Sequence, residues 1–250
     1  MNFKEFDNMM RRYEENLDQY ILPDMYIVAR LDGRSFSKYT KRKNFKKPFD
    51  ETFRDMMVKT TKNLMENSGF RIVYGYTESD EISLLFHPED NTFSRKTRKI
   101  NTTLAGQASA FFSMLAGEVV TFDCRVIPLP NLERVADYFA WRQEDSHRNS
   151  LNGWCYWTLR SQGFSKRKAT FLLLNKTIAY KNELLFQRGI NYNTIPEWQK
   201  KGIGLYFKNI EKKGYNPITG EENVTTRKIL FEDYSIPHGN EYREYIVNRL

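Results

Sequence analysis

The chain has 250 residues, of which 40% are hydrophobic, enough apolar material for one large domain or two small ones with a sizeable core. Its 39 lysines and arginines outnumber 31 acidic residues, and the formal net charge of +8 favours a polyanionic partner such as nucleic acid. Two cysteines, three histidines without zinc-ligand spacing, and no apolar run near the ~20 residues that span a bilayer exclude a disulfide framework, a zinc site and a membrane partner, so we expect a cytoplasmic protein.

The first expected elements are a surface helix that ends by Tyr20 and a strand over residues 25–32. β-Branched and aromatic residues make this strand suited to an inner position in a sheet. A basic loop is expected over 38–47. Apolar residues at helical spacing then predict a helix over 48–69, with proline at its start and glycine at its end.

A hairpin and a second helix complete the first half of the chain. Strands over 70–76 and 82–86 are joined by the polar turn TESDE, a helix is expected over 93–117, and a strand over 118–129. The order β-α-β-β-α-β is the split pattern of ferredoxin-like folds. Right-handed crossovers would place the first strand in the sheet's centre, beside the strand that leaves the hairpin.

The second half of the chain is expected to be mostly helical. Helices are predicted over 132–142 and 149–162, with shorter helical pieces as far as Phe186. Weak strand signals follow at 203–207 and 227–232. The sequence therefore predicts an α+β fold with a helical C-terminal extension.

Three acids gather in the hairpin turn, where Glu78, Asp80 and Glu81 lie within four residues. The predicted topology brings Asp32, at the end of the first strand, to the same edge of the sheet. Two carboxylates about 4 Å apart repel by ~1 kcal/mol in water and ~4 kcal/mol at an effective dielectric constant of 20. A raised pKa or a pair of Mg²⁺ ions would offset that repulsion, although the stretch taken alone also fits a polar turn.

Basic residues are expected around the same edge. A cluster at the start of the second long helix opposes the helix dipole, so it fits a phosphate site or a solvated basic face. The basic loop could cover a triphosphate or contact an RNA backbone. His147, at an expected helix start, fits a phosphate donor or an ordinary capping residue, and three tryptophans are interpreted as core. The cluster is Arg95, Lys96, Arg98 and Lys99, and the tryptophans are Trp141, Trp154 and Trp157.

Six motifs in fixed order carry a family resemblance. They are RLDGRSF (30–36), NFKKP (44–48), GYTESDEISLLF (75–86), FDCRV (122–126), WRQEDSHRNSLN (141–152) and YKNELLF (180–186). Together they resemble tRNA(His) guanylyltransferase and the guanylyltransferase-like 3′–5′ polymerases related to it. The similarity runs from about residue 4 to residue 190 and continues more faintly beyond.

The resemblance implies a palm-like catalytic core in residues 1–130, with residues 131–250 as a helical and mixed extension that packs on the core or merges with it. It implies nucleotide addition to the 5′ end of tRNA. In that chemistry ATP activates a 5′-monophosphate, and the 3′-hydroxyl of an incoming nucleoside triphosphate such as GTP attacks the activated end. Two Mg²⁺ ions and a homotetramer are implied as well.

The matching motifs also imply roles for individual residues. Asp32, Asp80 and the Gly33 carbonyl would hold the metal ions, and Glu81 would be a supporting catalytic carboxylate. The residues matched to nucleotide binding are Asp32, Gly33, Arg34, Ser35, Phe36, Ser37, Lys47, Ser79 and Asp80. Those matched to the activation step are Lys96, Lys99, His147, Asn149 and Lys181.

Three positions depart from the guanylyltransferases proper. Ser37 stands where those enzymes carry histidine, and Ser150 and Gly153 replace asparagines. These changes favour the branch that repairs 5′-truncated tRNA by Watson–Crick templating over untemplated G addition to tRNA(His). Two alternatives use the same topology: a nucleotidyl cyclase, against which the missing GG[DE]EF turn counts, and a non-catalytic RNA-binding module, against which the missing RNP1 pattern counts.

Overall fold

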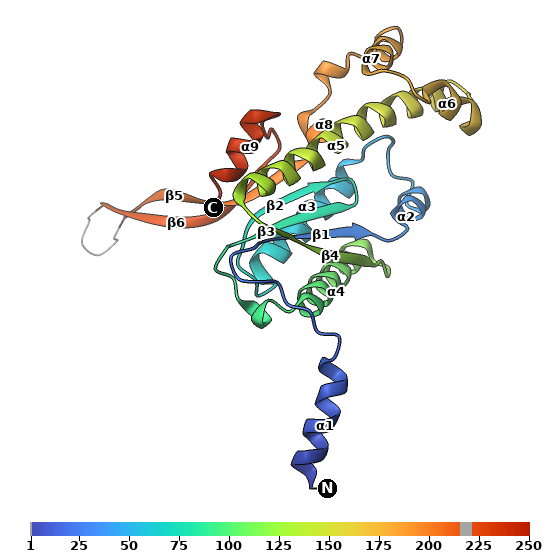
Figure 1. Ribbon diagram of the computed structural model, residues 1–250. Coiled ribbons are helices and arrows are strands. Elements are labelled where there is room, and N and C mark those ends of the chain that lie inside the picture. The colour runs from blue at the N-terminus through green and yellow to red at the C-terminus, as the bar shows by residue number, and fades with distance from the viewer. Residues whose placement is uncertain (1, 216–221) are drawn as a thin grey trace.

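The computed structural model describes residues 2–215 and 222–250. Within these ranges the strands form one antiparallel sheet in the order β4-β1-β3-β2-β5-β6 (Figure 1). The strands are β1 (Tyr26–Gly33), β2 (Ile72–Glu78), β3 (Glu81–Phe86), β4 (Phe122–Leu129), β5 (Ile203–Tyr215) and β6 (Glu222–Asp233).

Helices cover both faces of the sheet. In chain order they are α1 (Phe3–Glu15), α2 (Phe36–Arg42), α3 (Glu51–Asn67), α4 (Thr97–Ala116), α5 (Leu132–Ser161), α6 (Lys166–Leu173), α7 (Ile178–Phe186), α8 (Glu197–Lys201) and α9 (Asn240–Val247). Short 3₁₀ turns lie at η1 (Thr92–Arg95) and η2 (Tyr192–Thr194). None of these helices, in the part of the chain that is described, is long and apolar enough to cross a bilayer.

Three apolar clusters hold these layers together. Helices α3 and α4 pack on one face of the sheet around Leu31, Leu84 and Phe112. Helices α5 and α9 pack on the other face, where Tyr74 and its neighbours meet α5. The C-terminal half of α5 joins α6 and α7 in a separate cluster at the top of Figure 1.

The predicted β-α-β-β-α-β core is confirmed over residues 26–129. Strand β1 lies inside the sheet and pairs with β3 on one side and β4 on the other, both antiparallel. The weak strand signals at 203–207 and 227–232 are also confirmed. They belong to the long strands β5 and β6, and β5 pairs with β2, so the second half of the chain extends the same sheet.

Two expectations about the course of the helices are wrong. The expected basic loop over 38–47 begins with helix α2, because Phe36 and Tyr39, three residues apart, are buried and anchor one helical turn under a charged exterior. The expected break between 142 and 149 is absent, and α5 runs through it. Its buried polar side chains have partners elsewhere: Gln143 donates to the Pro237 carbonyl at 2.8 Å and Ser146 to the Lys200 carbonyl at 3.3 Å.

Candidate active site

The end of β1 and the turn between β2 and β3 meet at one edge of the sheet. The register places Asp32 directly opposite Glu81, as the predicted topology requires. One residue further on, the Gly33 amide donates to the Asp80 carbonyl at 3.0 Å. Because registered residues of antiparallel neighbours point to the same face, the carboxylates of Asp32 and Glu81 share one side of the sheet.

The backbone after β1 turns sharply at this edge. A Cβ on Gly33 would lie 2.3 Å from Cδ2 of Phe36, so only glycine fits there. Ser35 adopts the left-handed conformation at φ 62°, and the Phe36 ring then packs in the core against Phe112 and Phe122 at centroid distances of 5.1 and 5.0 Å. The buried ring fixes the path of residues 33–37 and leaves their backbone at the edge.

Asp80 occupies the two-residue turn between β2 and β3. The preceding Ser79 has φ 51°, and its Oγ donates to Oδ1 of Asp80 at 3.1 Å. Burial raises the pKa of Asp80, and the negative charge of Asp32 raises it further. The two carboxylates therefore lie close enough to repel each other.

This donor set fits a divalent cation. Carboxylate and carbonyl oxygens are the hard ligands that Mg²⁺ prefers, and the mutual repulsion of Asp32 and Asp80 is what a bound cation relieves. Among residues 2–215 and 222–250 no group of three or more His, Cys, Asp or Glu side chains is placed to hold a metal. A cation at this edge would therefore complete its coordination with oxygens from water or a substrate phosphate.

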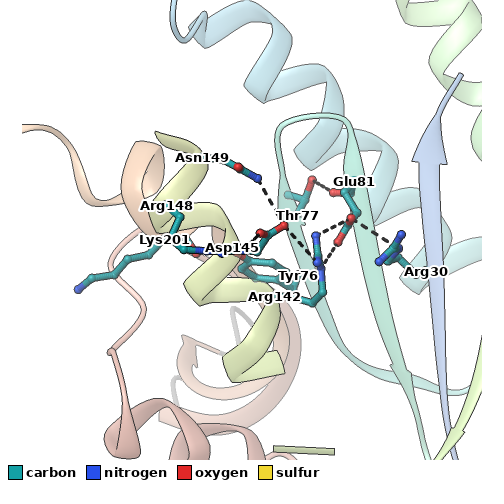
Figure 2. Close-up of polar contacts among 9 residues, drawn as sticks. All are labelled: Arg30, Tyr76, Thr77, Glu81, Arg142, Asp145, Arg148, Asn149 and Lys201. Atoms are coloured by element: carbon teal, nitrogen blue, oxygen red, sulfur yellow. Dashed lines mark hydrogen bonds and ion pairs between the residues drawn. The ribbon is translucent and has the colours of Figure 1, made fainter. Parts of the chain in front are cut away.

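Glu81 faces an arginine. Arg142 of α5 donates from Nε to Oε1 at 2.7 Å and from a terminal nitrogen to Oε2 at 2.8 Å, and Arg30 Nε lies 3.5 Å from Oε2 (Figure 2). Both side chains of the main pair are about nine-tenths buried, with 8% and 10% exposed. Bidentate arginine–carboxylate pairs are among the stronger polar contacts in proteins, so Glu81 joins α5 to the sheet.

The pair continues into a polar chain along α5. Arg142 lies 3.3 Å from Asp145, and the Asp145 carboxylate also accepts from Arg148 and, at 3.4 Å, from Asn149 (Figure 2). The spacing of three residues puts Arg142, Asp145 and Arg148 on one side of the helix. Glu81 thus connects the carboxylate edge to the middle of α5.

Glu78 ends β2, directly opposite Glu81. Burial, then the charge of Glu81, raises its pKa to about 8. A carboxyl whose pKa is higher in the folded than in the unfolded chain destabilises the fold as pH rises through that interval. We therefore expect Glu78→Gln, measured with a chelator present, to raise the free energy of unfolding by about 2–4 kcal/mol at pH 8 and by almost nothing at pH 4.

Urea denaturation at both pH values checks this prediction for Glu78. Glu89→Gln is the matched control, because the Glu89 side chain is 76% exposed and should change stability little at either pH. A stabilisation by Glu78→Gln of the same size at pH 4 and pH 8 would contradict a raised pKa.

A cavity of about 810 Å³ opens beside Asp80. It lies between the segment 36–57, the hairpin turn and the C-terminal half of α5. Lys47 lines this cavity. Its ammonium group donates to Thr40 Oγ1 at 2.9 Å and lies 5.8 Å from the Trp157 ring centroid. The lining cations are Lys41, Lys46, Lys47, Arg54, Arg160 and Lys166, and the lining aromatics include Phe45, Phe49, Phe53, Tyr156, Trp157 and Trp198.

The structure brings most of the predicted nucleotide-binding residues together. Those that line the cavity are Phe36, Ser37, Lys47, Ser79 and Asp80. Asp32, Gly33, Arg34 and Ser35 belong to β1 and the turn that follows, next to Asp80. The expectation that the three tryptophans are core residues is wrong for two of them. Trp157 lines the cavity and is 36% exposed, and Trp141 is 54% exposed.

The basic helix start lies elsewhere, so the expectation that it shares the carboxylate edge is wrong. Arg95 donates to the Met25 carbonyl, at the start of β1, whereas Asp32 is seven residues further along, roughly 23 Å at the rise of a strand. Lys96 pairs with Asp18 at 2.6 Å. Helix α4 begins at the end of the sheet where β1 starts and ends near Gly33. The charge pattern of the sequence does not show this direction, so it misplaced the helix start. Whether Lys96 and Lys99 act in activation stays a prediction.

His147, Asn149 and Lys181 lie on the helical side of the molecule. His147 is in the middle of α5 and not at a helix start as expected, with its ring 5.7 Å from Tyr192 and 6.0 Å from His238. Burial, then His238, lowers its pKa. Asn149 contacts Asp145, and the Lys181 carbonyl accepts from Cys155 Sγ at 3.4 Å.

Sequence reasoning missed Arg142 and the aromatic lining of the cavity. The signal for Arg142 was present, because Arg142, Asp145 and Arg148 repeat at three-residue spacing within WRQEDSHR. Its partner could not be found from spacing, since Glu81 lies 61 residues away in sequence.

Comparison with known proteins agrees with this architecture. The family model described as "tRNAHis guanylyltransferase" matches residues 7–130, and that described as "Thg1 C terminal domain" matches 133–234. The tRNA(His) guanylyltransferase of Neurospora crassa is 35% identical over 81% of this chain and 73% of its own length, and a probable tRNA(His) guanylyltransferase of Drosophila melanogaster is 36% identical over 86% and 76%.

Solved structures give the same result. The tRNA(His) guanylyltransferase of Saccharomyces cerevisiae has a TM-score of 0.72 and 31% identity, covering 78% of this chain and 91% of its own. A bacterial tRNA(His) guanylyltransferase-like protein in complex with ATP has a TM-score of 0.75 and 27% identity, with 98% of both chains covered. These matches place the chain among the transferases that act on tRNA. It belongs to the tRNA(His) guanylyltransferase family.

Proposed function

We propose that this protein is a nucleotidyltransferase that adds nucleotides to the 5′ end of tRNA in the 3′–5′ direction, with a palm-like core in residues 1–130. The single observation that carries the proposal is the meeting of Asp32 and Asp80 beside a large cavity lined by cations. Both features suit phosphoryl transfer, where positioning and neutralisation of charge are the main catalytic contributions. We also propose that it works in the cytoplasm as a homo-oligomer.

The carboxylate edge would hold two Mg²⁺ ions through Asp32, Asp80 and the Gly33 carbonyl. When bound, Mg²⁺ would neutralise phosphate oxygens and lower the pKa of an attacking hydroxyl. The chain's own residues hold the rest of the site in place. Phe36 anchors the turn after β1, whose amides at residues 35–37 would meet the phosphates, Ser79 orients Asp80, and the Glu81–Arg142 pair holds α5 against the sheet.

The cavity supplies the two surfaces that a nucleoside triphosphate needs. Lys47 and the other cations can meet the phosphates, while Trp157 and the neighbouring aromatics offer a flat apolar surface to a base. Related bacterial proteins have been solved in complex with ATP and with GTP, which is consistent with nucleotide substrates for this chain.

We propose template-dependent repair of 5′-truncated tRNA as the main activity, with G addition to tRNA(His) as the second candidate. Ser150 and Gly153, which depart from the guanylyltransferases proper, both belong to helix α5. The Ser150 hydroxyl accepts a hydrogen bond from the Tyr192 hydroxyl at 2.9 Å, and a Cβ on Gly153 would lie 3.7 Å from Pro48 Cβ. Neither position offers an asparagine amide for reading a base, so the template would select the nucleotide.

End-labelled tRNAs that lack their first nucleotide test the proposal directly. Each is incubated with ATP, Mg²⁺ and one nucleoside triphosphate at a time. Incorporation only of the nucleotide complementary to the base that faces the missing position supports templated repair, whereas addition of G regardless of that base supports guanylyltransferase activity. A cyclic nucleotide as the main product without RNA would contradict both.

Lys47 provides a second test of the nucleotide site. We expect Lys47→Ala to raise the KM for the nucleoside triphosphate by about tenfold or more, because one charge-assisted phosphate contact contributes about 1.5–3 kcal/mol. Lys38→Ala is the matched control, since Lys38 is an exposed lysine in the same basic segment but is not part of the cavity lining. Equal KM values for the two variants would remove Lys47 from the site.

A further inference from the structure

A second cavity, of about 350 Å³, lies at the end of the sheet opposite the carboxylate edge. It opens where β2 begins and β3 ends, beside β5, β6 and the residues that follow α9. Figure 1 shows the C-terminus beside the point at which β5 and β6 leave the rest of the sheet. Val73, in the cavity lining, precedes Asp80 by seven residues, so the two sites are roughly 23 Å apart at the rise of a strand.

The lining of this cavity, which we call the basic pocket, carries Arg71, His87, Lys228 and Arg249. No acidic residue of the described chain belongs to the lining. Lys228 and Arg249 contact aromatic rings and have no ion-pair partner within residues 2–215 and 222–250. Arg71 lies 3.4 Å from Glu89, but the two side chains are 57% and 76% exposed, so this pair contributes little. Like charges around one cavity repel each other, and a bound anion would relieve that repulsion.

Aromatic rings hold two of these cations in place. The Arg249 guanidinium carbon lies 3.7 Å from the Tyr206 ring centroid and 4.0 Å from that of Tyr245, and the Lys228 ammonium lies 4.6 Å from the Phe207 ring centroid. Arg249 Nε is buried without a hydrogen-bond partner, so no acceptor of the described chain neutralises it there. Because side chains that are already ordered lose less entropy when a ligand binds, the basic pocket differs from a solvated basic surface.

The loop after β3 adds a directional donor. His87 Nδ1 accepts a hydrogen bond from the Glu89 backbone amide at 3.2 Å, so a neutral ring carries its proton on Nε2 and can donate it to a ligand. Asp90, the other acid of this loop, is 4% exposed, and its carboxylate accepts from the backbone amides of Arg71 and Thr92. This acid is therefore used within the fold and leaves the charge of the basic pocket unbalanced.

The donors of the basic pocket suit a phosphate group. Arginine and lysine bind phosphate through charge-assisted hydrogen bonds, and about 350 Å³ is near the lower limit for a small-molecule site. The rings that would otherwise stack a base are covered, Tyr206 by Arg249 and Phe207 by Lys228. A phosphate of an RNA backbone fits this arrangement better than a nucleotide, whose base would need a free ring.

We propose that the basic pocket binds a backbone phosphate of the tRNA, roughly 23 Å from the edge at which the 5′ end reacts. Contacts to phosphates position a nucleic acid without reading its sequence, so this contact would hold any tRNA in the same place relative to the carboxylate edge. The phosphate site follows from the pocket itself, whereas the choice of tRNA as its ligand rests on the proposed function.

Filter binding of tRNA at several salt concentrations, with a chelator and without nucleotide, tests this contact. We expect Arg71→Gln/Lys228→Gln to weaken the affinity about tenfold and to reduce the slope of log K against log salt by about one. The matched control is Arg12→Gln/Lys59→Gln, which removes one exposed arginine and one exposed lysine outside the lining and should leave the affinity unchanged. Arg71→Lys/Lys228→Arg keeps both charges and should retain most of the affinity. Melting temperatures show that each variant is folded.

Acylation of lysines followed by mass spectrometry then locates the ligand. Bound tRNA should slow the modification of Lys228 several-fold and leave that of Lys59 unchanged. Protection of Lys228 by inorganic phosphate, with unchanged tRNA affinity in the Arg71→Gln/Lys228→Gln protein, would make a free anion the ligand and overturn the assignment to tRNA. Equal losses of affinity in the two glutamine variants would reflect net charge alone and overturn the site.

These measurements need no turnover, so they separate this proposal from the proposed function. A protein that binds tRNA through the basic pocket but adds no nucleotide would contradict the proposed function and support the phosphate site. A protein that adds nucleotides while its tRNA affinity is the same in wild type and Arg71→Gln/Lys228→Gln would do the reverse.

Discussion

Asp80→Ala is expected to lower the rate of nucleotide addition by at least about 10³-fold while leaving tRNA affinity nearly unchanged. In the proposed site Asp32 and Asp80 would share a divalent cation, so removal of one carboxylate would remove half of the protein's charged ligands. Asp32→Ala should have an effect of similar size. Single-turnover kinetics with labelled tRNA measure the rate, and filter binding measures the affinity.

Stability separates this loss of activity from unfolding. Because burial and Asp32 both raise the pKa of Asp80, the ionised carboxylate destabilises the empty site at neutral pH, and Asp80→Asn should melt at the same temperature as the wild type or higher. Glu89→Gln is the matched control. The Glu89 side chain is 76% exposed, follows the far end of β3 and is absent from the cavity lining, so its replacement should change the rate little. An Asp80→Ala protein with near wild-type activity would contradict the proposed site.

The sequence was sufficient to predict the carboxylate edge, because that edge follows from topology. A strand ending in Asp32 and a hairpin turning at Asp80 need only the β-α-β-β-α-β order and the handedness of crossovers to be brought together, and both are local or general properties. The register of Asp32 with Glu81 follows from the same pairing.

The parts that were not predictable depend on contacts between distant segments. The middle of α5 has a polar sequence that resembles a break, and only its partners Glu81, Pro237 and Lys200 show that these side chains are satisfied within a continuous helix. The position of Lys96 was also misjudged, because the charge pattern of a helix start does not say at which end of the sheet the helix begins.

Arg142→Met is expected to lower the free energy of unfolding by about 3–5 kcal/mol, because it leaves the Glu81 carboxylate buried without its main partner. Arg30 Nε, 3.5 Å from Glu81, compensates only in part. Glu81→Gln should cost less, since a neutral amide tolerates burial better than a charge. The double variant Glu81→Leu/Arg142→Met should recover most of the loss, since replacing a whole buried ion pair by apolar residues is often nearly neutral. Urea denaturation of the wild type, Glu81→Leu, Arg142→Met and the double variant gives the coupling free energy.

The control for this cycle is Arg148→Met, in the same polar chain. The Arg148 side chain is 66% exposed, so its pair with Asp145 should contribute less than about 1 kcal/mol. If Arg148→Met and Arg142→Met were equally destabilising, the strength of the contact would not follow burial, and Glu81 would not be the anchor of α5. If instead the double variant is stable but slow in nucleotide addition, the ion pair serves to position α5 relative to the carboxylate edge. Apolar packing would then restore the stability of the fold but not the position of α5.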